Sequence, residues 1–242
     1  MDIEALNKKY NTEFTNNLYK NKHIFNEFYE ACNNKFMDGC GSYLFDAKSG
    51  YKYCDKMYIK QELLYNQVKN ANDVLEIGTY MGHSAFIMLL SNPNLNITCI
   101  DVDDTYSGPC VKILNKYFNN KITFVCGNSI DVLPKLKTKF DFFHIDGHHD
   151  QNHINKEFIL CSRINKNDRI FRVLFDDALC IPELLNNIRN KYKIIKDIVP
   201  CCLATNAYLE IEINNYYYYC NFFENSIHKL KKGGIFIIEI FI

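Results

Sequence analysis

Residues 143–153 read FHIDGHHDQNH and place four histidines and two aspartates directly after an apolar run. Three interpretations fit these residue types. The histidines could bind zinc, one histidine could act as a base beside a metal held by carboxylates, or the segment could be solvated loop and helix cap. The choice depends on which other residues the fold brings to the same place.

A glycine-containing turn, EIGTYMGHSA at 76–85, is the second candidate for chemistry. Gly78 allows a sharp turn after an apolar strand, and Gly82 allows close approach to the start of a helix. His83, Ser84 and free backbone N–H groups would face an anion there. The pattern lacks the third glycine of nicotinamide dinucleotide sites and the lysine of a P-loop. It therefore suits a ligand that has a carboxylate but no pyrophosphate.

Acidic and polar residues end the next two expected strands. Asp101 follows Gly78 by 23 positions (101 − 78 = 23), where an acid can bind ribose hydroxyls, and Asp103 comes just after it. Asn128 and Ser129 end the third strand and could contact a purine edge. Ribose, purine and an amino-acid carboxylate together describe S-adenosylmethionine. The structural alternative is a helix cap with two turn aspartates.

Alternating strands and helices from residue 73 onward would position these residues. Such alternation predicts a doubly wound, Rossmann-like α/β fold with helices on both faces of a mostly parallel sheet. Strand-like segments lie at 192–199, 207–220 and 233–242, and some of them would extend the sheet, partly antiparallel, to a total of seven strands. The other strands are expected at 74–78, 96–103, 121–128, 140–146 and 169–177, and helices at 83–91, 108–120, 129–136, 153–164 and 181–192.

Composition narrows the possible functions. The 242 residues suffice for one domain with a terminal elaboration, and 28 basic residues balance 28 acidic ones. A net charge of zero with no basic block disfavours nucleic-acid or membrane-surface partners. The 11 cysteines are irregularly spaced, which favours buried, reduced thiols, Cys99 and Cys126 among them, and a cytoplasmic location. The apolar runs are much shorter than the roughly 20 residues of a membrane-spanning helix.

The motif EIGTYMGHSA resembles the first motif of class I S-adenosylmethionine-dependent methyltransferases. It is most similar to the metal-dependent O-methyltransferases of the catechol and caffeoyl-coenzyme A type. The similarity continues through ITCIDVD, KITFVCGNSIDVLPKL, FDFFHIDGHH and RVLFDDALC, and covers about residues 73–180. IDGHH at 145–149 is nearer to the related sugar O-methyltransferases. The resemblance implies a methyltransferase domain at 71–242 and, at 1–70, an N-terminal helical extension that covers the acceptor site.

The resemblance implies a site for S-adenosylmethionine at the first three strand ends. In it the turn holds the methionine part, Asp101 binds the ribose and Ser129 lies at the adenine. With the residues proposed above from strand ends, the expected cofactor site consists of Glu76 as support of the turn and Gly78, Tyr80, Gly82, Ser84, Asp101, Asn128 and Ser129.

The resemblance also implies a site for magnesium or another hard divalent cation, formed by Asp146, Asp176 and Asp177. The family commonly has asparagine at the last of these positions, so Asp177 is a departure. His149 lies where the catechol enzymes carry a catalytic lysine, and His148 is the second candidate for the base. The predicted reaction is methylation of a hydroxyl group on a small sugar or phenol. A homodimer is possible.

Alternatives to this interpretation remain. A zinc site could form from His149 and His153, four apart on a helix, with His144 or His148 joining them. The site could also hold no metal, with His153 and Asp150 in loop and cap roles. At the level of the whole chain, the rivals are a catalytically silent methyltransferase-like subunit and a nicotinamide-dependent oxidoreductase, the latter disfavoured by the missing glycine.

Overall fold

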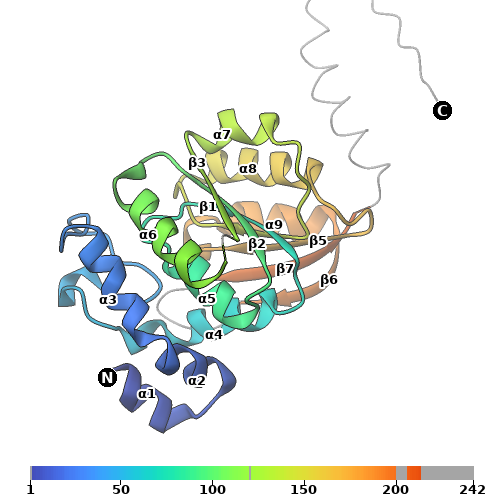
Figure 1. The fold of residues 1–242 in the computed structure, drawn as a ribbon. Helices are drawn as coiled ribbons and strands as arrows, with labels where there is room; N and C mark the ends of the chain where they lie inside the picture. The colour runs from blue at the N-terminus through green and yellow to red at the C-terminus, as the bar shows by residue number, and fades with distance from the viewer. Residues whose placement is uncertain (1, 120, 200–205, 214–242) are drawn as a thin grey trace, which may run out of the picture.

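The computed structural model describes residues 2–119, 121–199 and 206–213, with a seven-stranded sheet at its centre (Figure 1). The strand order is β3-β2-β1-β4-β5-β7-β6. β1 to β5 are parallel, β7 is antiparallel to β5, and β6 is antiparallel to β7. The predicted fold class is therefore confirmed, and the expected strand at 233–242 lies outside the described residues. The strands are β1 (Asp73–Ile77), β2 (Asn96–Asp101), β3 (Ile122–Cys126), β4 (Phe142–Ile145), β5 (Ile170–Phe175), β6 (Lys193–Ile198) and β7 (Ala207–Glu212).

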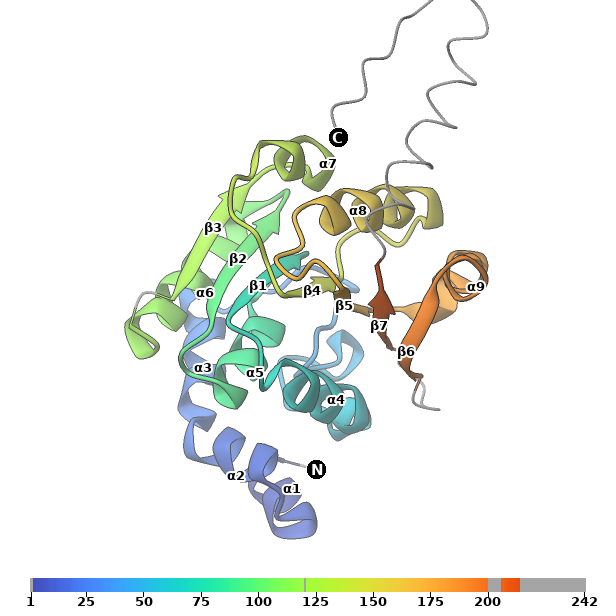
Figure 2. The same cartoon turned by 90° about the vertical axis from the view of Figure 1, so that its right-hand side faces the viewer.

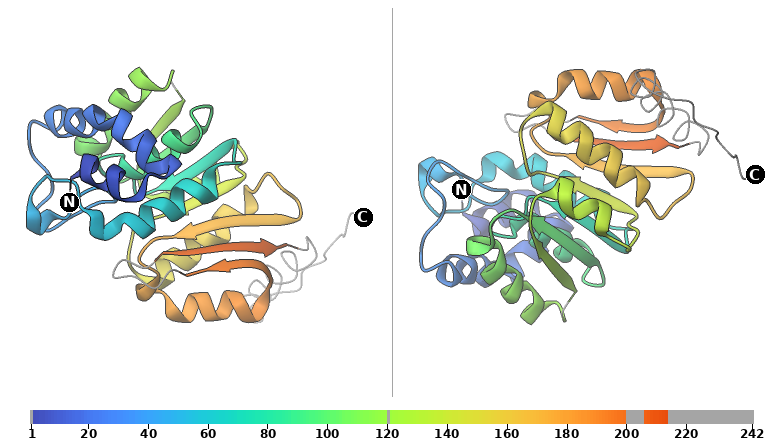
Figure 3. Two further views of the ribbon diagram at one scale, coloured as in Figure 1. Left: turned by 90° about the horizontal axis from the view of Figure 1, so that it is seen from below. Right: turned by 90° about the horizontal axis from the view of Figure 1, so that it is seen from above.

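Helices cover both faces of this sheet (Figure 2). One face carries α4 (Tyr58–Val68), α5 (His83–Ser91) and α6 (Asp104–Tyr117), and the other carries α7 (Ser129–Val132), α8 (Gln151–Arg163) and α9 (Pro182–Lys191). The N-terminal α1 (Ile3–Tyr10), α2 (Glu13–Lys20) and α3 (Lys22–Ala31) lie outside α5 and α6. These three helices lie over the β1–β3 half of the sheet, whereas α9 lies over the antiparallel half (Figure 3).

Two apolar cores form because successive side chains of a strand point to opposite faces. On β1, Val74 packs in the core beneath α4 to α6, whereas Leu75 and Ile77 pack in the core beneath α8 and α9. Glu76 points to the same side as Val74 and is fully buried there, although it is acidic. A buried carboxyl needs partners, and these partners form part of the site.

Two helices begin earlier than the apolar spacing predicts, because an upstream aspartate caps each of them. α6 begins at Asp104 and not at 108, since the Asp103 carboxylate accepts hydrogen bonds from the Thr105 N–H and hydroxyl. α8 begins at Gln151, since Asp150 accepts from the His153 N–H at 2.9 Å. The cap role expected for Asp150 is thereby confirmed, and His149 precedes the helix.

Helix α4 turns a lysine, and not the neighbouring isoleucine, towards the interior. Ile59 is 48% exposed, whereas its neighbour Lys60 is only 6% exposed. Lys60 lies four residues before Leu64 and eight before Val68, so it shares their inward face. This register takes a lysine into the interior, next to the carboxyl ends of the strands.

The cysteines within the described ranges are free thiols. Cys99 is buried as expected, whereas Cys126 is exposed, because β3 is the edge strand of the sheet. No helix in the described part of the chain combines the length and the apolar character needed to cross a membrane.

Candidate functional site

A cavity of about 590 Å³ opens at the carboxyl ends of the parallel strands. It lies where the strand order reverses between β1 and β4, the usual ligand position in a doubly wound sheet. Residues of the 37–46 loop and of α4 line it together with the strand ends. Eleven of the residues predicted from the sequence line this cavity: Gly78, Tyr80, Ser84, Asp101, Asn128, Ser129, Asp146, His148, His149, Asp176 and Asp177.

Gly78 permits the close approach of two strand ends. Its φ is +84°, in the left-handed region, and a Cβ at this position would lie 2.2 Å from the Asp146 carbonyl oxygen. The predicted sharp turn is confirmed, and only glycine fits it. Gly82 also has a positive φ, of +70°, but it lies against Leu114 of α6 and outside the cavity lining.

Asp101 binds the turn from the end of β2. Its Oδ2 accepts hydrogen bonds from the Thr79 N–H at 2.9 Å, the Tyr80 N–H at 2.7 Å and the Ser107 hydroxyl at 3.1 Å. These two N–H groups of the turn are therefore not free for a ligand anion, because the chain supplies a carboxylate itself. Asp101 Oδ1 accepts only from the Asp103 N–H, at 3.2 Å, among the described residues.

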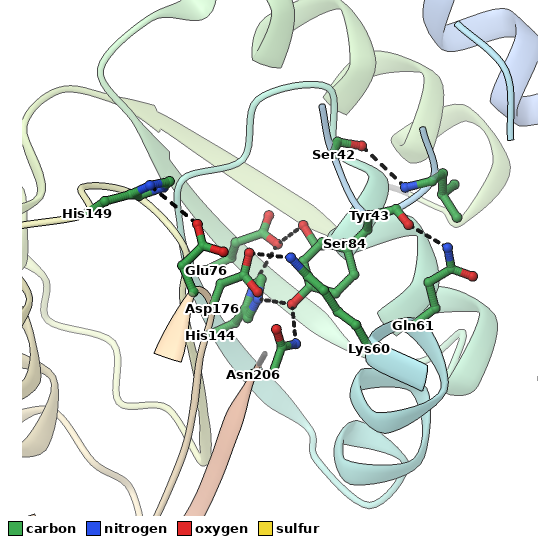
Figure 4. A network of polar contacts seen from close by, with 12 residues as sticks. Ser42, Tyr43, Lys60, Gln61, Glu76, Ser84, His144, His149, Asp176 and Asn206 are labelled. Atoms are coloured by element: carbon green, nitrogen blue, oxygen red, sulfur yellow. Dashed lines mark hydrogen bonds and ion pairs between the residues drawn. The ribbon is translucent and has the colours of Figure 1, made fainter. Parts of the chain in front are cut away.

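Glu76 lies at the centre of a buried polar network behind the turn (Figure 4). Its Oε1 accepts the Ser84 hydroxyl at 2.6 Å and lies 3.2 Å from Nδ1 of His144. The other ring nitrogen of His144 lies 2.9 Å from the Tyr43 hydroxyl, which also accepts from the Asn206 side chain at 2.9 Å. The network ties Ser84 to three other elements, in keeping with the predicted support of the turn by Glu76.

The third strand end adjoins a carboxyl group on α8. Asn128 caps α7 through the Ile130 N–H at 3.0 Å, and the Ser129 hydroxyl donates to Glu157 Oε1 at 2.5 Å. Burial raises the pKa of Glu157 to about 7. Its second oxygen, Oε2, is buried and has no hydrogen-bond partner in the described part of the chain. This end of the cavity thus offers a polar group that a ligand donor could satisfy.

The carboxyl groups after β4 and β5 meet a lysine. Lys60 Nζ donates to Asp176 Oδ2 at 2.5 Å, and the two side chains are only 7% and 6% exposed. Burial raises the pKa of Asp146 well above its usual range, and the negative charge of Asp176 raises it further. Burial opposes charge on Asp176 and Lys60 too, but their mutual attraction outweighs it, lowering the Asp176 pKa and raising the Lys60 pKa. A lysine ammonium therefore balances the buried carboxylate.

These residues do not fit a hard divalent cation in this arrangement. Magnesium needs several oxygen ligands that are free to point at it, whereas an ammonium occupies Oδ2 of Asp176 and only its Oδ1 has no partner in the described part of the chain. Asp177 has a backbone φ of +47° and is paired with a histidine, since its Oδ2 lies 3.3 Å from His149 Nδ1. Within the described ranges, no three histidine, cysteine, aspartate or glutamate side chains are grouped to hold one metal ion.

The histidines that suggested zinc are distributed over separate contacts. His149 contacts Asp177, His148 stacks on His153 with ring centroids 4.7 Å apart, and His144 is fully buried in the Glu76 network. The zinc interpretation therefore has no support in the geometry. His149 remains beside the cavity with a carboxylate partner, the arrangement expected of an oriented base.

Comparisons with protein families and with solved structures both find matches for this chain. A family model described as "Methyltransferase domain" matches residues 75–178. No curated protein matches the sequence at a significant level. One similar structure is the O-methyltransferase TomG from Streptomyces achromogenes, which is involved in tomaymycin synthesis and was solved in complex with S-adenosylmethionine. It matches with a TM-score of 0.58 at 14% identity, over 79% of this chain and 90% of that chain. The fold is that of a class I methyltransferase.

Two further solved structures agree. The O-methyltransferase from Bacillus cereus in complex with S-adenosylhomocysteine has a TM-score of 0.57 at 12% identity, over 79% of this chain and 91% of that one. The S-adenosylhomocysteine-bound methyltransferase PaMTH1 from Podospora anserina has a TM-score of 0.55 at 13% identity, over 77% and 86%. At such identities the likeness establishes the methyltransferase fold and not the activity.

Several residues of the site do not emerge from the sequence motifs. Lys60 lies at an inward helix position, and Glu157 lies on the buried stripe of α8 with Ile154, Phe158 and Cys161. A charged residue in step with an apolar stripe is a usable signal in both cases. Tyr43 gives no such signal, since it follows a glycine-bearing loop and reaches the site by tertiary packing alone.

Proposed function

We propose that the protein is an S-adenosylmethionine-dependent O-methyltransferase that acts on a hydroxyl group of a small sugar or phenol. The observation that carries the proposal is that the turn after β1 and the ends of β2, β3, β4 and β5 line one cavity in a methyltransferase fold. A volume of about 590 Å³ suits a small-molecule site.

The order of the strand ends supports a position for the cofactor. Gly78, Tyr80 and Ser84 at the first strand end would hold its methionine part, and Asp101 at the second would bind the ribose through the side of its carboxylate that is less engaged. Ser129 and Glu157 at the third would lie at the adenine. A buried glutamate oxygen without a donor suits an exocyclic amino group.

The remaining side of the cavity would receive the acceptor. It is lined by the 37–46 loop and by Lys60, so the proposed cover role of residues 1–70 concerns this side. S-adenosylmethionine supplies a methyl group on a sulfonium: the acceptor oxygen forms a bond to the methyl carbon as the carbon–sulfur bond breaks, and its electron pair remains on sulfur. His149, oriented by Asp177, would take the hydroxyl proton. Alignment of the acceptor oxygen with the methyl group, and exclusion of water from the cavity, would supply the rest of the rate acceleration.

The test is methyl transfer from S-adenosylmethionine to a panel of phenols and sugars, followed by release of S-adenosylhomocysteine and mass spectrometry of the product. We expect acceptor-dependent release and a methyl ether. A product methylated on nitrogen or sulfur would refute the O-methyltransferase assignment. Cofactor binding without transfer to any acceptor in a broad panel would favour the silent, methyltransferase-like subunit.

A further inference from the structure

We propose that the Lys60 ammonium is a built-in cation that takes the place of a divalent metal beside Asp146 and Asp176, so that methyl transfer needs no metal ion. The inference rests on the proposed function for its catalytic part, but the cation site itself can be tested without turnover. Three segments far apart in the sequence create it, namely α4 and the residues that follow β4 and β5.

The position of Lys60 is specified by packing on several sides. Its Nζ lies 2.5 Å from Asp176 Oδ2 and 4.2 Å from the centre of the Tyr43 ring, whose face attracts a cation. The Tyr43 hydroxyl is itself held by His144 and Asn206. The ring therefore has a fixed orientation, and the lysine is enclosed between an aromatic face and a carboxylate (Figure 4).

Charge explains why this arrangement excludes a metal. A dication bound to Asp176 would lie within a few ångströms of the ammonium, in a poorly hydrated place where like charges repel strongly. A divalent ion would need Lys60 to leave, and Lys60 belongs to the inward face of α4 with Leu64 and Val68. The side chain occupies the interior and not a flexible surface position, at 6% exposure.

The ammonium can also serve the acceptor. Lys60 lines the cavity, and among the described residues its hydrogen-bond acceptor is Asp176. An ammonium has three N–H donors. With one on Asp176 and one side against Tyr43, a donor is left for the oxygen of the acceptor. It would stabilise the developing negative charge on that oxygen while His149 takes the proton, and Lys60 keeps its own protons throughout.

The first measurement is Mn²⁺ binding to the full chain. The protein is first treated with chelator to remove metal and is then titrated with Mn²⁺, and binding is monitored by electron paramagnetic resonance. We expect no stoichiometric binding by the wild type. Lys60→Met, which removes the charge and keeps the length, should gain a site and bind Mn²⁺ at least tenfold more tightly. Lys69→Met, at the exposed C-cap of the same helix, should behave as the wild type.

One Mn²⁺ bound per wild-type chain and lost in Asp176→Asn would overturn the proposal. So would a folded Lys60→Met variant without a gain in Mn²⁺ binding, because the carboxyl groups would then be no cation site at all. If Lys60→Met does not fold, the wild type and Lys60→Arg decide, and both must keep their transfer rate in chelator. Calorimetric binding of S-adenosylhomocysteine to the same samples separates failure of this inference from failure of the proposed function.

Discussion

The buried ion pair between Lys60 and Asp176 should contribute more to the free energy of unfolding than its distance alone would predict. Lys60 to Asp176 measures 2.5 Å and Lys69 to Glu13 measures 2.6 Å, so the two pairs are almost equally short. Their exposure differs greatly. The first pair is 7% and 6% exposed and the second 47% and 59%. Burial therefore decides how much each lysine contributes to the free energy of unfolding.

Lys60→Met leaves the Asp176 carboxylate buried without its cation. Loss of one partner of a buried pair costs about 3–5 kcal/mol. For a protein of this size each kcal/mol lowers the melting temperature by about 2–4 °C, so the fall should be roughly 6–20 °C. Lys69→Met breaks an exposed, screened pair and should cost less than about 1 kcal/mol. The two variants make the same chemical change, one within α4 and one at its C-cap.

The assay is urea unfolding followed by far-UV circular dichroism, with thermal melts as a second measure. The double variant Lys60→Met/Asp176→Asn should recover part of the loss, because no charge is then left buried without a partner. We expect a coupling of about 2 kcal/mol, within the range of contacting residues. Strictly additive losses, or equal losses for Lys60→Met and Lys69→Met, would refute the reasoning.

Three further predictions concern the cavity. Gly78→Ala should destabilise the fold and abolish cofactor binding, because its Cβ would overlap a main-chain carbonyl oxygen, and calorimetry with thermal melts measures both. Glu157→Gln should change the pH dependence of unfolding. The folded-state pKa of about 7 lies above the ordinary 4.5, so wild-type stability falls by about 3 kcal/mol, relative to the variant, as pH rises from 4.5 to 7. His149→Ala should lower kcat by about 10²–10⁴ and leave S-adenosylhomocysteine affinity unchanged.

Two of these three predictions have a control variant in the chain. Gly39 also has a positive φ, of +75°, but open space around it, so Gly39→Ala should cost only the backbone strain. Similar losses at Gly39 and Gly78 would contradict the close-approach argument. His23 is exposed on α3, and His23→Ala should keep full activity. A pH profile of stability shared by Glu157→Gln and the wild type would show that Glu157 is not the group that titrates.

The strand ends are predictable from the sequence because buried parallel strands alternate with helices, and each polar residue directly after an apolar run falls at the same edge of the sheet. The sequence pattern alone therefore brings Asp101, Ser129, Asp146 and Asp176 to one end of the sheet, where they line one cavity. The errors at α6 and α8 are errors of boundary. Aspartate caps begin those helices before their apolar pattern starts.

The partners of those residues are not predictable in the same way. The sequence places Asp176 at a strand end, but it does not show that Lys60, 116 positions earlier, fills the space beside it. The sequence predicts that the N–H groups of the turn are free to bind an anion, whereas the Asp101 carboxylate already accepts hydrogen bonds from two of them. Which group satisfies a buried charge is a property of tertiary packing, and periodicity in the sequence does not record it.

We expect the cavity at the ends of β1 to β5 to bind S-adenosylmethionine. The most direct test is calorimetric titration of the purified protein with S-adenosylhomocysteine in the presence of chelator, beside Asp101→Ala and the exposed Asp131→Ala as control. We expect micromolar binding with one site per chain, strongly weakened in Asp101→Ala and unchanged in Asp131→Ala. No binding by the wild type, with or without magnesium, would contradict it.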